Sequence, residues 1–151
     1  MYSHILISTD GSELAKKGVD HGLSLAKRLG AKATIITVTE PFPIYATAGT
    51  MGVWPPIDPK EYELYEATQT EAAAKVLAAI EDSAEKLGVP VETVHVLEKR
   101  PAEAIIDTAK TRGCDLIVMA SHGRRGLGRL LLGSQTSEVV AYGQVPVLVV
   151  R

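Results

Sequence analysis

The sequence predicts one α/β domain: an open, mainly parallel five-stranded sheet with helices on both faces. The chain has 151 residues, and a single domain usually has about 100–200. Its residues are 46% hydrophobic and 23% charged, which is ordinary for a globular protein. Short β-branched runs alternate with helical patterns in the order β-α-β-α-β-α-β-α-β, which implies parallel strands. We therefore expect residues 1–151 to form a single domain.

The first strand, helix and second strand follow from apolar spacing. Ile5–Ile7 is a short buried strand, and the apolar residues of Glu13–Leu29 recur at helical spacing. Ser12 is a good N-cap for this helix, and Gly30 suits the left-handed residue that ends it. The β-branched run 33–38 is the second strand.

The rest of the chain continues this alternation. Asp58, Pro59 and Glu61 form a capping-box pattern, so a second helix begins there and ends at 88–90. The remaining predicted elements are a strand at 91–97, a helix from Pro101 to Gly113, a strand at 116–119, a helix at about 134–142 and a strand at 145–150.

The segment Pro41–Ile57 is longer than a typical connection, and such loops are often lids or binding elements. Its apolar side chains, and those of the next helix, could contact a ligand or instead cover a sheet edge or a neighbouring subunit. These side chains are Phe42, Tyr45, Met51, Trp54, Tyr62 and Tyr65.

The composition excludes several classes of protein. A net charge of −2 and a pI near 6.1 argue against a nucleic-acid binder that uses positive charge, and against a polybasic membrane anchor. No apolar stretch reaches the roughly 18–20 residues of a membrane span, and the N-terminus lacks signal-peptide features. Cys114 is the single cysteine, so no internal disulfide can form. We expect a cytoplasmic protein that binds neither nucleic acid nor membrane.

Polar residues follow three of the predicted strands. Open parallel sheets bind ligands outside the carboxyl ends of the strands, where the strand order reverses. The candidate segments are therefore Thr9–Ser12, Thr39–Glu40 and Ala120–Gly123.

The last of these segments opens a glycine-rich loop, residues 120–134. Glycines let consecutive backbone N–H groups approach one anion, and Gly133-Ser134 begins a helix whose N-terminus favours phosphate. Ser134 could cap that helix or donate to the phosphate. The loop favours an anion or nucleotide site, with a simple turn as the alternative. It is neither a P-loop nor a dinucleotide fingerprint, because the required lysine and glycine spacings are absent.

These residues resemble the universal stress protein family, whose ATP-binding branch carries the loop Gly-x2-Gly-x9-Gly-Ser/Thr. Gly123, Gly133 and Ser134 match this motif, and Ala120 replaces its first glycine. The resemblance covers essentially the whole chain, including the segments 8–12, 115–119 and 146–150. It implies a Rossmann-like fold of the adenine nucleotide alpha hydrolase type, with strand order 3-2-1-4-5.

Ala120 bears on how a nucleotide would fit. If the position requires a left-handed backbone, alanine costs about 1–2 kcal/mol there. If it requires only a close approach, a small shift of the base or ribose accommodates one methyl group.

The resemblance also implies which residues bind an adenine nucleotide. Asp10 would accept hydrogen bonds from the ribose or lie near the adenine, while Val38 and Met119 would pack against the base. The ribose and phosphates would be surrounded by the loop, mainly through N–H groups. The loop residues of this predicted site are His122, Gly123, Gly133, Ser134 and Gln135. Thr9 and Ala120 belong to the same predicted site. Mg²⁺ would bind through phosphate oxygens and water, so no metal site made by protein side chains is expected.

Several of these residues also have structural interpretations. Asp10 could end its strand in an Asx-turn, Val38 and Met119 could be core residues, and His122 could be an uncharged hydrogen-bonding residue. Arginines of the loop could reach phosphates, face solvent or contact another subunit; they are Arg124, Arg125 and Arg129. Zinc is not expected, because the spacing is wrong among His4, His21 and His95.

The last strand indicates self-association. Residues 146–150 are all apolar, and an unprotected edge of this kind promotes aggregation. Family members pair this strand with its twin across a two-fold axis, so the resemblance implies a homodimer through Val145–Arg151.

Three functions stay open. The first is an ATP-binding regulatory protein of the stress response, in which bound nucleotide orders the loop and shifts partner affinity. The second is an ATPase or nucleotide transferase, but the sequence shows no base–nucleophile arrangement, so we assign no catalytic residue and expect any hydrolysis to be slow. The third is a nucleotide-free dimeric interaction module, which Ala120 keeps open.

Overall fold

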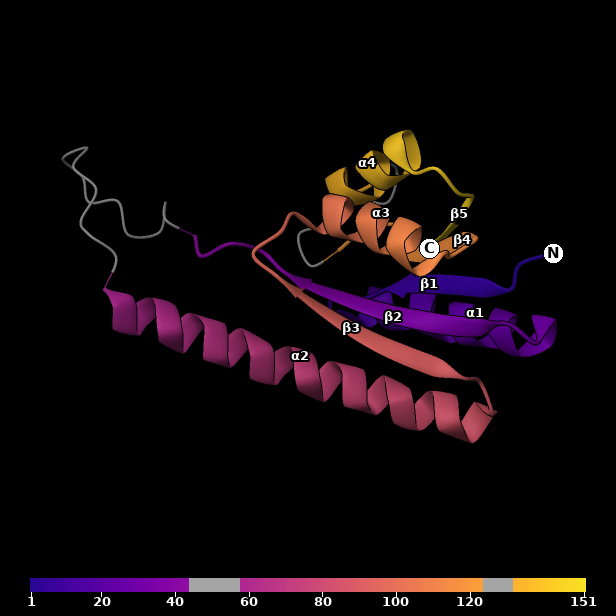
Figure 1. Cartoon of the computed structure of the whole chain (residues 1–151), viewed down its shortest axis with the longest axis horizontal. Helices are drawn as coiled ribbons and strands as arrows, with labels where there is room; N and C mark the ends of the chain where they lie inside the picture. The colour runs from indigo at the N-terminus through magenta and orange to yellow at the C-terminus, as the bar shows by residue number, and fades with distance from the viewer. Residues whose placement is uncertain (44–57, 124–131) are drawn as a thin grey trace.

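A computed structural model describes residues 1–43, 58–123 and 132–151 and confirms the predicted α/β architecture (Figure 1). In this described part of the chain, five strands form one sheet in the order β3-β2-β1-β4-β5, and every neighbouring pair is parallel. The order is the one expected from the sequence. The strands are β1 (His4–Ser8), β2 (Lys32–Thr39), β3 (Val91–Leu97), β4 (Leu116–Ala120) and β5 (Val147–Val150).

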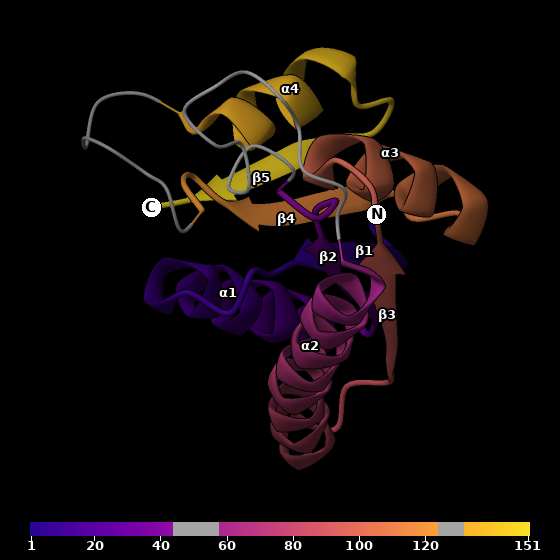
Figure 2. The same cartoon turned by 90° about the vertical axis from the view of Figure 1, so that its left-hand side faces the viewer.

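Helices cover both faces of the sheet (Figure 2). The helices α1 (Glu13–Leu29) and α2 (Pro59–Leu87) lie on one face, and α3 (Pro101–Arg112) and α4 (Ser134–Tyr142) lie on the other. Successive strand residues point to opposite faces. Each face therefore has its own buried core.

The side chains of β1 show this division. Ile5 and Ile7 belong to the core beneath α1 and α2, whereas Leu6 belongs to the core beneath α3. All three side chains are fully buried. Within the described ranges, no helix has both the length and the apolar character needed to cross a bilayer.

The helix ends agree with the expected caps. Ser12 Oγ accepts from the Ala15 N–H at 3.2 Å at the start of α1, and Gly30 ends this helix in the left-handed region with φ 64°. At the start of α2, Asp58 Oδ1 accepts from the Lys60 N–H at 2.9 Å. These caps satisfy backbone groups that helix geometry leaves unpaired.

The start of β5 differs from the sequence prediction, and the side-chain cap that the sequence allowed at α4 is absent. β5 begins at Val147 rather than at 145, because Pro146 has no N–H to donate to the ladder. The Pro146 carbonyl still accepts from the Ile117 N–H at 3.0 Å. At α4 the N-cap is Gly133 and no side chain caps the helix, so Ser134 is its first helical residue and not its cap.

The topology fixes where a ligand would bind. The chain runs from β1 outward to β2 and β3, and then returns to the other side of β1 to form β4 and β5. The strand order therefore reverses between β1 and β4. The crevice outside the carboxyl ends of these two strands is the expected binding position in a sheet of this kind.

Candidate functional site

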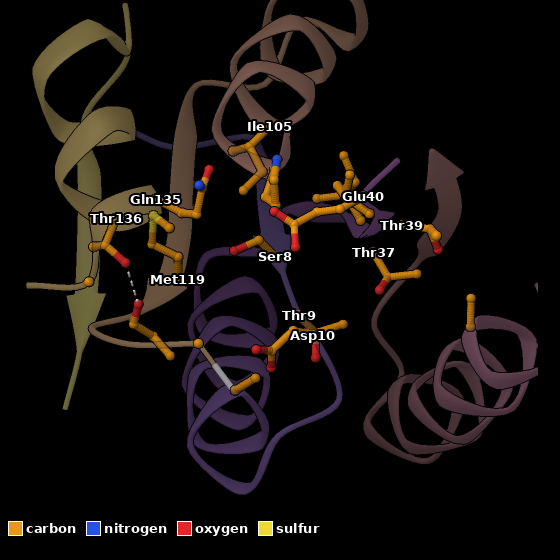
Figure 3. Close-up of a pocket in the computed structure, with 18 of the residues that line it drawn as sticks. Ser8, Thr9, Asp10, Thr37, Thr39, Glu40, Ile105, Met119, Gln135 and Thr136 are labelled. Carbon is orange, nitrogen blue, oxygen red and sulfur yellow. Dashed lines mark hydrogen bonds between the residues drawn. The ribbon is translucent and has the colours of Figure 1, made fainter. Parts of the chain in front are cut away.

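A cavity of about 700 Å³ lies at this switch point (Figure 3). Small-molecule sites usually have volumes of about 300–1,000 Å³. Every residue that the sequence analysis assigned to ligand binding lines this cavity: Thr9, Asp10, Val38, Met119, Ala120, His122, Gly123, Gly133, Ser134 and Gln135. The structure thus brings the predicted residues together, and their contact with a ligand stays a prediction.

The turn after β1 holds the carboxylate of Asp10 in place. Asp10 Oδ1 accepts from the Ser12 N–H at 2.9 Å, and Thr9 Oγ1 accepts from the Gly11 N–H at 3.1 Å. The Asx-turn that the sequence allowed is therefore present. Because Asp10 also lines the cavity, the turn is compatible with a binding role and orients the carboxylate for it.

Gly123 lies against this carboxylate. A Cβ atom added at Gly123 would be only 2.9 Å from Asp10 Oδ2, which is closer than such atoms normally approach. The backbone of the loop after β4 can therefore reach Asp10 only because residue 123 has no side chain.

Ala120 has an ordinary strand conformation. It is the last residue of β4 and pairs with Val150, and among the described non-glycine residues only Glu98 has a positive φ. The backbone of Ala120 is therefore not left-handed, and alanine carries no conformational strain at this position. The Ala120 carbonyl accepts from Thr136 Oγ1 at 3.0 Å, the dashed contact in Figure 3, which joins β4 to α4.

The N-terminus of α4 faces the same region. The Gly133 N–H donates to the Ser121 carbonyl at 2.8 Å and fixes the start of the helix beside the loop. Helix geometry leaves the N–H groups of Ser134, Gln135 and Thr136 without intrahelical acceptors. These N–H groups and the helix dipole favour an anion at this end of the cavity.

His122 has a ring nitrogen without a partner. Its Nδ1 is hydrogen-bonded to Ser121 Oγ at 2.9 Å, whereas its buried Nε2 has no partner in the described structure. Leaving a buried polar atom unpaired is costly, and such atoms are uncommon in native proteins. His122 itself lines the cavity.

Gln135 has a structural contact that the sequence analysis missed. Its Oε1 accepts from the Ala102 N–H at 2.8 Å and so caps α3, whose own N-cap residue, Arg100, makes no side-chain cap. Arg100 is also paired with Glu138 of α4 at 2.6 Å. Gln135 therefore ties α4 to α3 as well as lining the cavity. A cap supplied by a residue so distant in sequence has no local signal.

The apolar wall of the cavity lies beneath α3. Val38 is half-buried and Met119 is buried, and both pack in the core of this face with Ile36 and Ile105. They are core residues and cavity residues at once, as the sequence allowed. Ile36 and Ile105 also line the cavity but were not predicted as site residues, because burial in a strand or helix gives no separate signal of ligand contact.

Helix α2 supplies a wall of the cavity, and Tyr65 is the one residue of that wall for which the sequence allowed ligand contact. Its lining residues follow helical spacing on one face: Tyr65, Gln69, Ala72, Ala73 and Val76. The same spacing would result from a buried face, so periodicity alone cannot distinguish a core from a cavity wall.

The described side chains that line the cavity carry negative charge. Asp10 and Glu40 line it, and no lysine or arginine is among the described lining residues. The loop arginines Arg124, Arg125 and Arg129 and residues 44–57 of the long connection lie outside the described residues. In the part of the chain that is described, no three His, Cys, Asp or Glu side chains are grouped to hold a metal ion.

A parallel sheet wound in two directions, with a ligand-sized cavity at its switch point, defines a class of α/β ligand-binding domains. Within this class, the chain belongs to the universal stress protein family, whose family model matches residues 1–151.

Individual relatives agree with this assignment. The chain is 35% identical over 151 residues to a universal stress protein of Thermus aquaticus, and the match covers 100% of both chains. Among solved structures, it resembles hypothetical protein MJ0577 of Methanocaldococcus jannaschii with a TM-score of 0.82 and 29% identity, covering 99% of this chain and 96% of that one. It shares its fold with a universal stress protein solved in complex with cAMP, with a TM-score of 0.66 and 24% identity, covering 99% and 97% of the two chains.

Proposed function

We propose that this protein is a small cytoplasmic regulatory protein of the stress response that binds ATP or another adenine nucleotide and acts as a homodimer. The observation that carries the proposal is the cavity at the switch point of the sheet, which is lined by the first residues of α4, by His122 and by an apolar wall.

The apolar wall of the cavity suits the base of a nucleotide, and the N-terminus of α4 suits its phosphates. Val38, Met119 and Ile105 form an apolar surface that matches a flat aromatic base. The first-turn N–H groups of α4 and the ring of His122 suit the anionic tail. Asp10, whose carboxylate is fixed by the turn after β1, suits ribose hydroxyl groups as a hydrogen-bond acceptor.

The cation needed to balance the phosphates would come with the ligand. No described lysine or arginine lines the cavity, and Mg²⁺ binds readily through phosphate oxygens and water. This supports a magnesium–nucleotide complex as the bound species. A universal stress protein with the same fold has been solved in complex with cAMP, which is also an adenine nucleotide, and this supports the proposed ligand class.

The edge of the sheet supports the homodimer. β5 is an edge strand of the sheet in the described part of the chain, and its Leu148 is 37% exposed, with Val140 and Tyr142 of α4 also exposed. An apolar edge strand of this kind is usually covered. Pairing of residues 145–151 with the same residues of a second copy would cover it, and bound nucleotide would regulate the affinity of this dimer for other proteins.

Thermal unfolding with and without Mg-ATP tests the nucleotide proposal. At a ligand concentration of about 100 times Kd, binding stabilises the folded state by about 2.7 kcal/mol, which raises Tm by roughly 5–10 °C in a domain of this size. Mg-GTP, which has the same phosphates, should give a smaller rise. An unchanged Tm with millimolar Mg-ATP would contradict the proposal and favour the nucleotide-free module.

Two further measurements separate the remaining alternatives. Mass spectrometry of ligand released by acid identifies any nucleotide that copurifies, and sedimentation velocity gives the oligomeric state. Turnover in a phosphate-release assay that is lost in Ser134→Ala would favour an enzyme over a regulatory protein. A monomer at micromolar concentration would contradict the dimer without affecting nucleotide binding.

A further inference from the structure

The cavity extends over both faces of the sheet, and the proposed nucleotide site uses only one of them. Along β2, Ile36 and Val38 point toward α3, so the alternating residues Thr37 and Thr39 point toward α2. All four line the cavity. In Figure 3, Thr37 and Thr39 lie on the opposite side of the pocket from Met119 and Gln135, with Ser8, Thr9 and Asp10 between them.

We call the part of the cavity on this second face the α2 lobe. It is formed by β1, β2, α1 and α2. Its residues are Thr9, Ala15, Thr37, Thr39, Tyr65, Gln69, Ala72, Ala73 and Val76. Except for Thr9, none of them belongs to the predicted nucleotide site.

The sheet side of the α2 lobe presents hydroxyl groups. Thr9 Oγ1 accepts from the Gly11 N–H at 3.1 Å, and Thr39 Oγ1 is hydrogen-bonded to His95 Nε2 at 2.8 Å. Thr37 is 7% exposed, and no hydrogen bond of its hydroxyl is found within the described structure. The hydroxyl of Thr37 is therefore available to a molecule in the lobe.

The helix side is mainly small and apolar, with one amide. Ala72, Ala73 and Val76 leave room opposite the threonines, and half-buried Gln69 adds a donor and an acceptor. A molecule between these walls would meet hydroxyl groups on one side and hydrocarbon on the other.

Aromatic rings lie at the mouth of the α2 lobe. Tyr65 lines the cavity and donates its hydroxyl to the Glu40 carbonyl at 3.1 Å. Phe42 packs edge-on against Tyr65, with ring centroids 5.1 Å apart and planes at 89°, and it also contacts Tyr62 at 6.1 Å. Rings held in this way present fixed apolar surfaces.

The charge of the described lobe residues favours a neutral ligand over an anionic one. Its own residues are all uncharged, the neighbouring side chains Asp10 and Glu40 are acidic, and no lysine or arginine is among the described lining residues. An anion would meet repulsion from these two carboxylates, and no described side chain of the lobe would offset it. A neutral ligand meets no such penalty.

We propose that the α2 lobe binds a small neutral polyhydroxylated molecule, a sugar or a polyol, beside the nucleotide site. Hydroxyl groups of such a molecule both donate to and accept from threonine hydroxyls and the Gln69 amide. Its C–H surface packs against the alanines and against Tyr65. The two sites share one cavity, so the protein would respond jointly to an adenine nucleotide and a neutral solute.

NMR titration of the isotope-labelled full chain with D-glucose, D-ribose or glycerol tests this proposal, first without nucleotide and then with saturating Mg-ATP. We expect at least one probe to give saturable shifts at Thr37, Gln69 and Ala73 under both conditions. D-glucose or D-ribose binding alone would assign a sugar site, and glycerol binding would extend it to polyols. No saturable shift with any probe up to tens of millimolar would overturn the proposal, and so would shifts that Mg-ATP abolishes by competition.

Variants locate the binding in the lobe. Thr37→Val keeps the shape of the side chain but removes its hydroxyl, and should weaken probe binding roughly fivefold to tenfold. Ala72→Leu fills the lobe from an exposed helix position and should abolish binding. The matched control is Ala74→Leu, which places the same side chain on an exposed part of α2 outside the cavity. Equal affinity of Ala72→Leu and Ala74→Leu would overturn the proposal. Because the first titration contains no nucleotide, its result does not depend on whether ATP binds.

Discussion

The amino and carboxyl ends of the sheet both contain paired polar residues, but within the described structure only the carboxyl end also surrounds a cavity with them. There, His4 Nε2 is hydrogen-bonded to Thr34 Oγ1 at 2.8 Å, and Asp115 accepts from the Ser3 N–H, the Ser3 hydroxyl and the His4 N–H at 2.7–3.0 Å. At the carboxyl end, His122 and the threonines surround a cavity of about 700 Å³, and His122 Nε2 has no partner in the described structure. Similar side chains thus hold the strands together at one end and leave a place for a ligand at the other.

Ionisation at the amino end is consistent with a closed, structural region. Burial, assisted by the charge of Lys32, lowers the pKa of His4, and burial raises the pKa of the Cys114 thiol to about 11. Burial opposes ionisation of Asp115, but hydrogen bonds from Ser3 and His4 outweigh it and hold the pKa of this carboxyl below its ordinary value. Cys114 is therefore an uncharged, unreactive thiol at neutral pH.

The largest effect should come from Gly123→Val at the carboxyl end. A Cβ atom at this position would be 2.9 Å from Asp10 Oδ2, so the substitution must displace the loop or the carboxylate. We expect the affinity for Mg-ATP to fall by roughly a hundredfold, which corresponds to about 2.8 kcal/mol. Isothermal titration calorimetry measures this change, and sedimentation should show an unchanged oligomeric state. An unchanged affinity would show that the loop does not hold the nucleotide.

At the amino end, Asp115→Ala should have the opposite effect and change stability without changing nucleotide affinity. It removes the acceptor of three hydrogen bonds and should lower the free energy of unfolding by about 2 kcal/mol. Urea denaturation gives this value. The affinity for Mg-ATP should stay unchanged, because Asp115 does not line the cavity.

A matched control for this variant is Asp107→Ala. Asp107 is paired with Lys99 on the surface at 3.1 Å, and loss of such a pair usually changes stability by less than about 1 kcal/mol. If Asp107→Ala and Asp115→Ala destabilised the protein equally, the amino-end network would have no special structural role.

The smallest effect concerns pH. The pKa of His4 is lower in the folded protein than its ordinary value, so the unfolded chain binds more protons as the pH falls below about 6.5. The stability contributed by uncharged His4 is complete above that value and is lost as the pH falls toward the folded-state pKa. His4→Gln, which removes this titration, should reduce the loss of unfolding free energy between neutral and mildly acidic pH by less than about 1 kcal/mol. A pH dependence identical in both proteins would contradict the role given to His4.

The sequence predicted most of the fold because its signals are local. Alternation of β-branched runs with amphipathic segments located every strand and helix of the described chain, and residues such as Ser12, Asp58 and Gly30 marked helix ends correctly. The start of β5 was wrong by two residues, because the strand pattern outweighed the missing N–H of Pro146.

The candidate site was only partly predictable, because much of it depends on contacts between distant segments. Strand ends and the glycine-rich loop located the residues that line the cavity on the α3 side. The cap that Gln135 supplies to α3 and the wall formed by Gln69 and Ala72 of α2 depend on packing between elements. The backbone conformation of Ala120 was likewise decided by its pairing in β4 and not by its residue type.

Binding of a nucleotide at the carboxyl end of the sheet is the central prediction for this protein. NMR titration of the isotope-labelled protein with Mg-ATP tests it most directly. We predict saturable shifts for the amides of Gly123, Gly133 and Ser134, with those of His4 and Asp115 unchanged. The absence of saturable shifts, or shifts confined to the amino end, would contradict the claim.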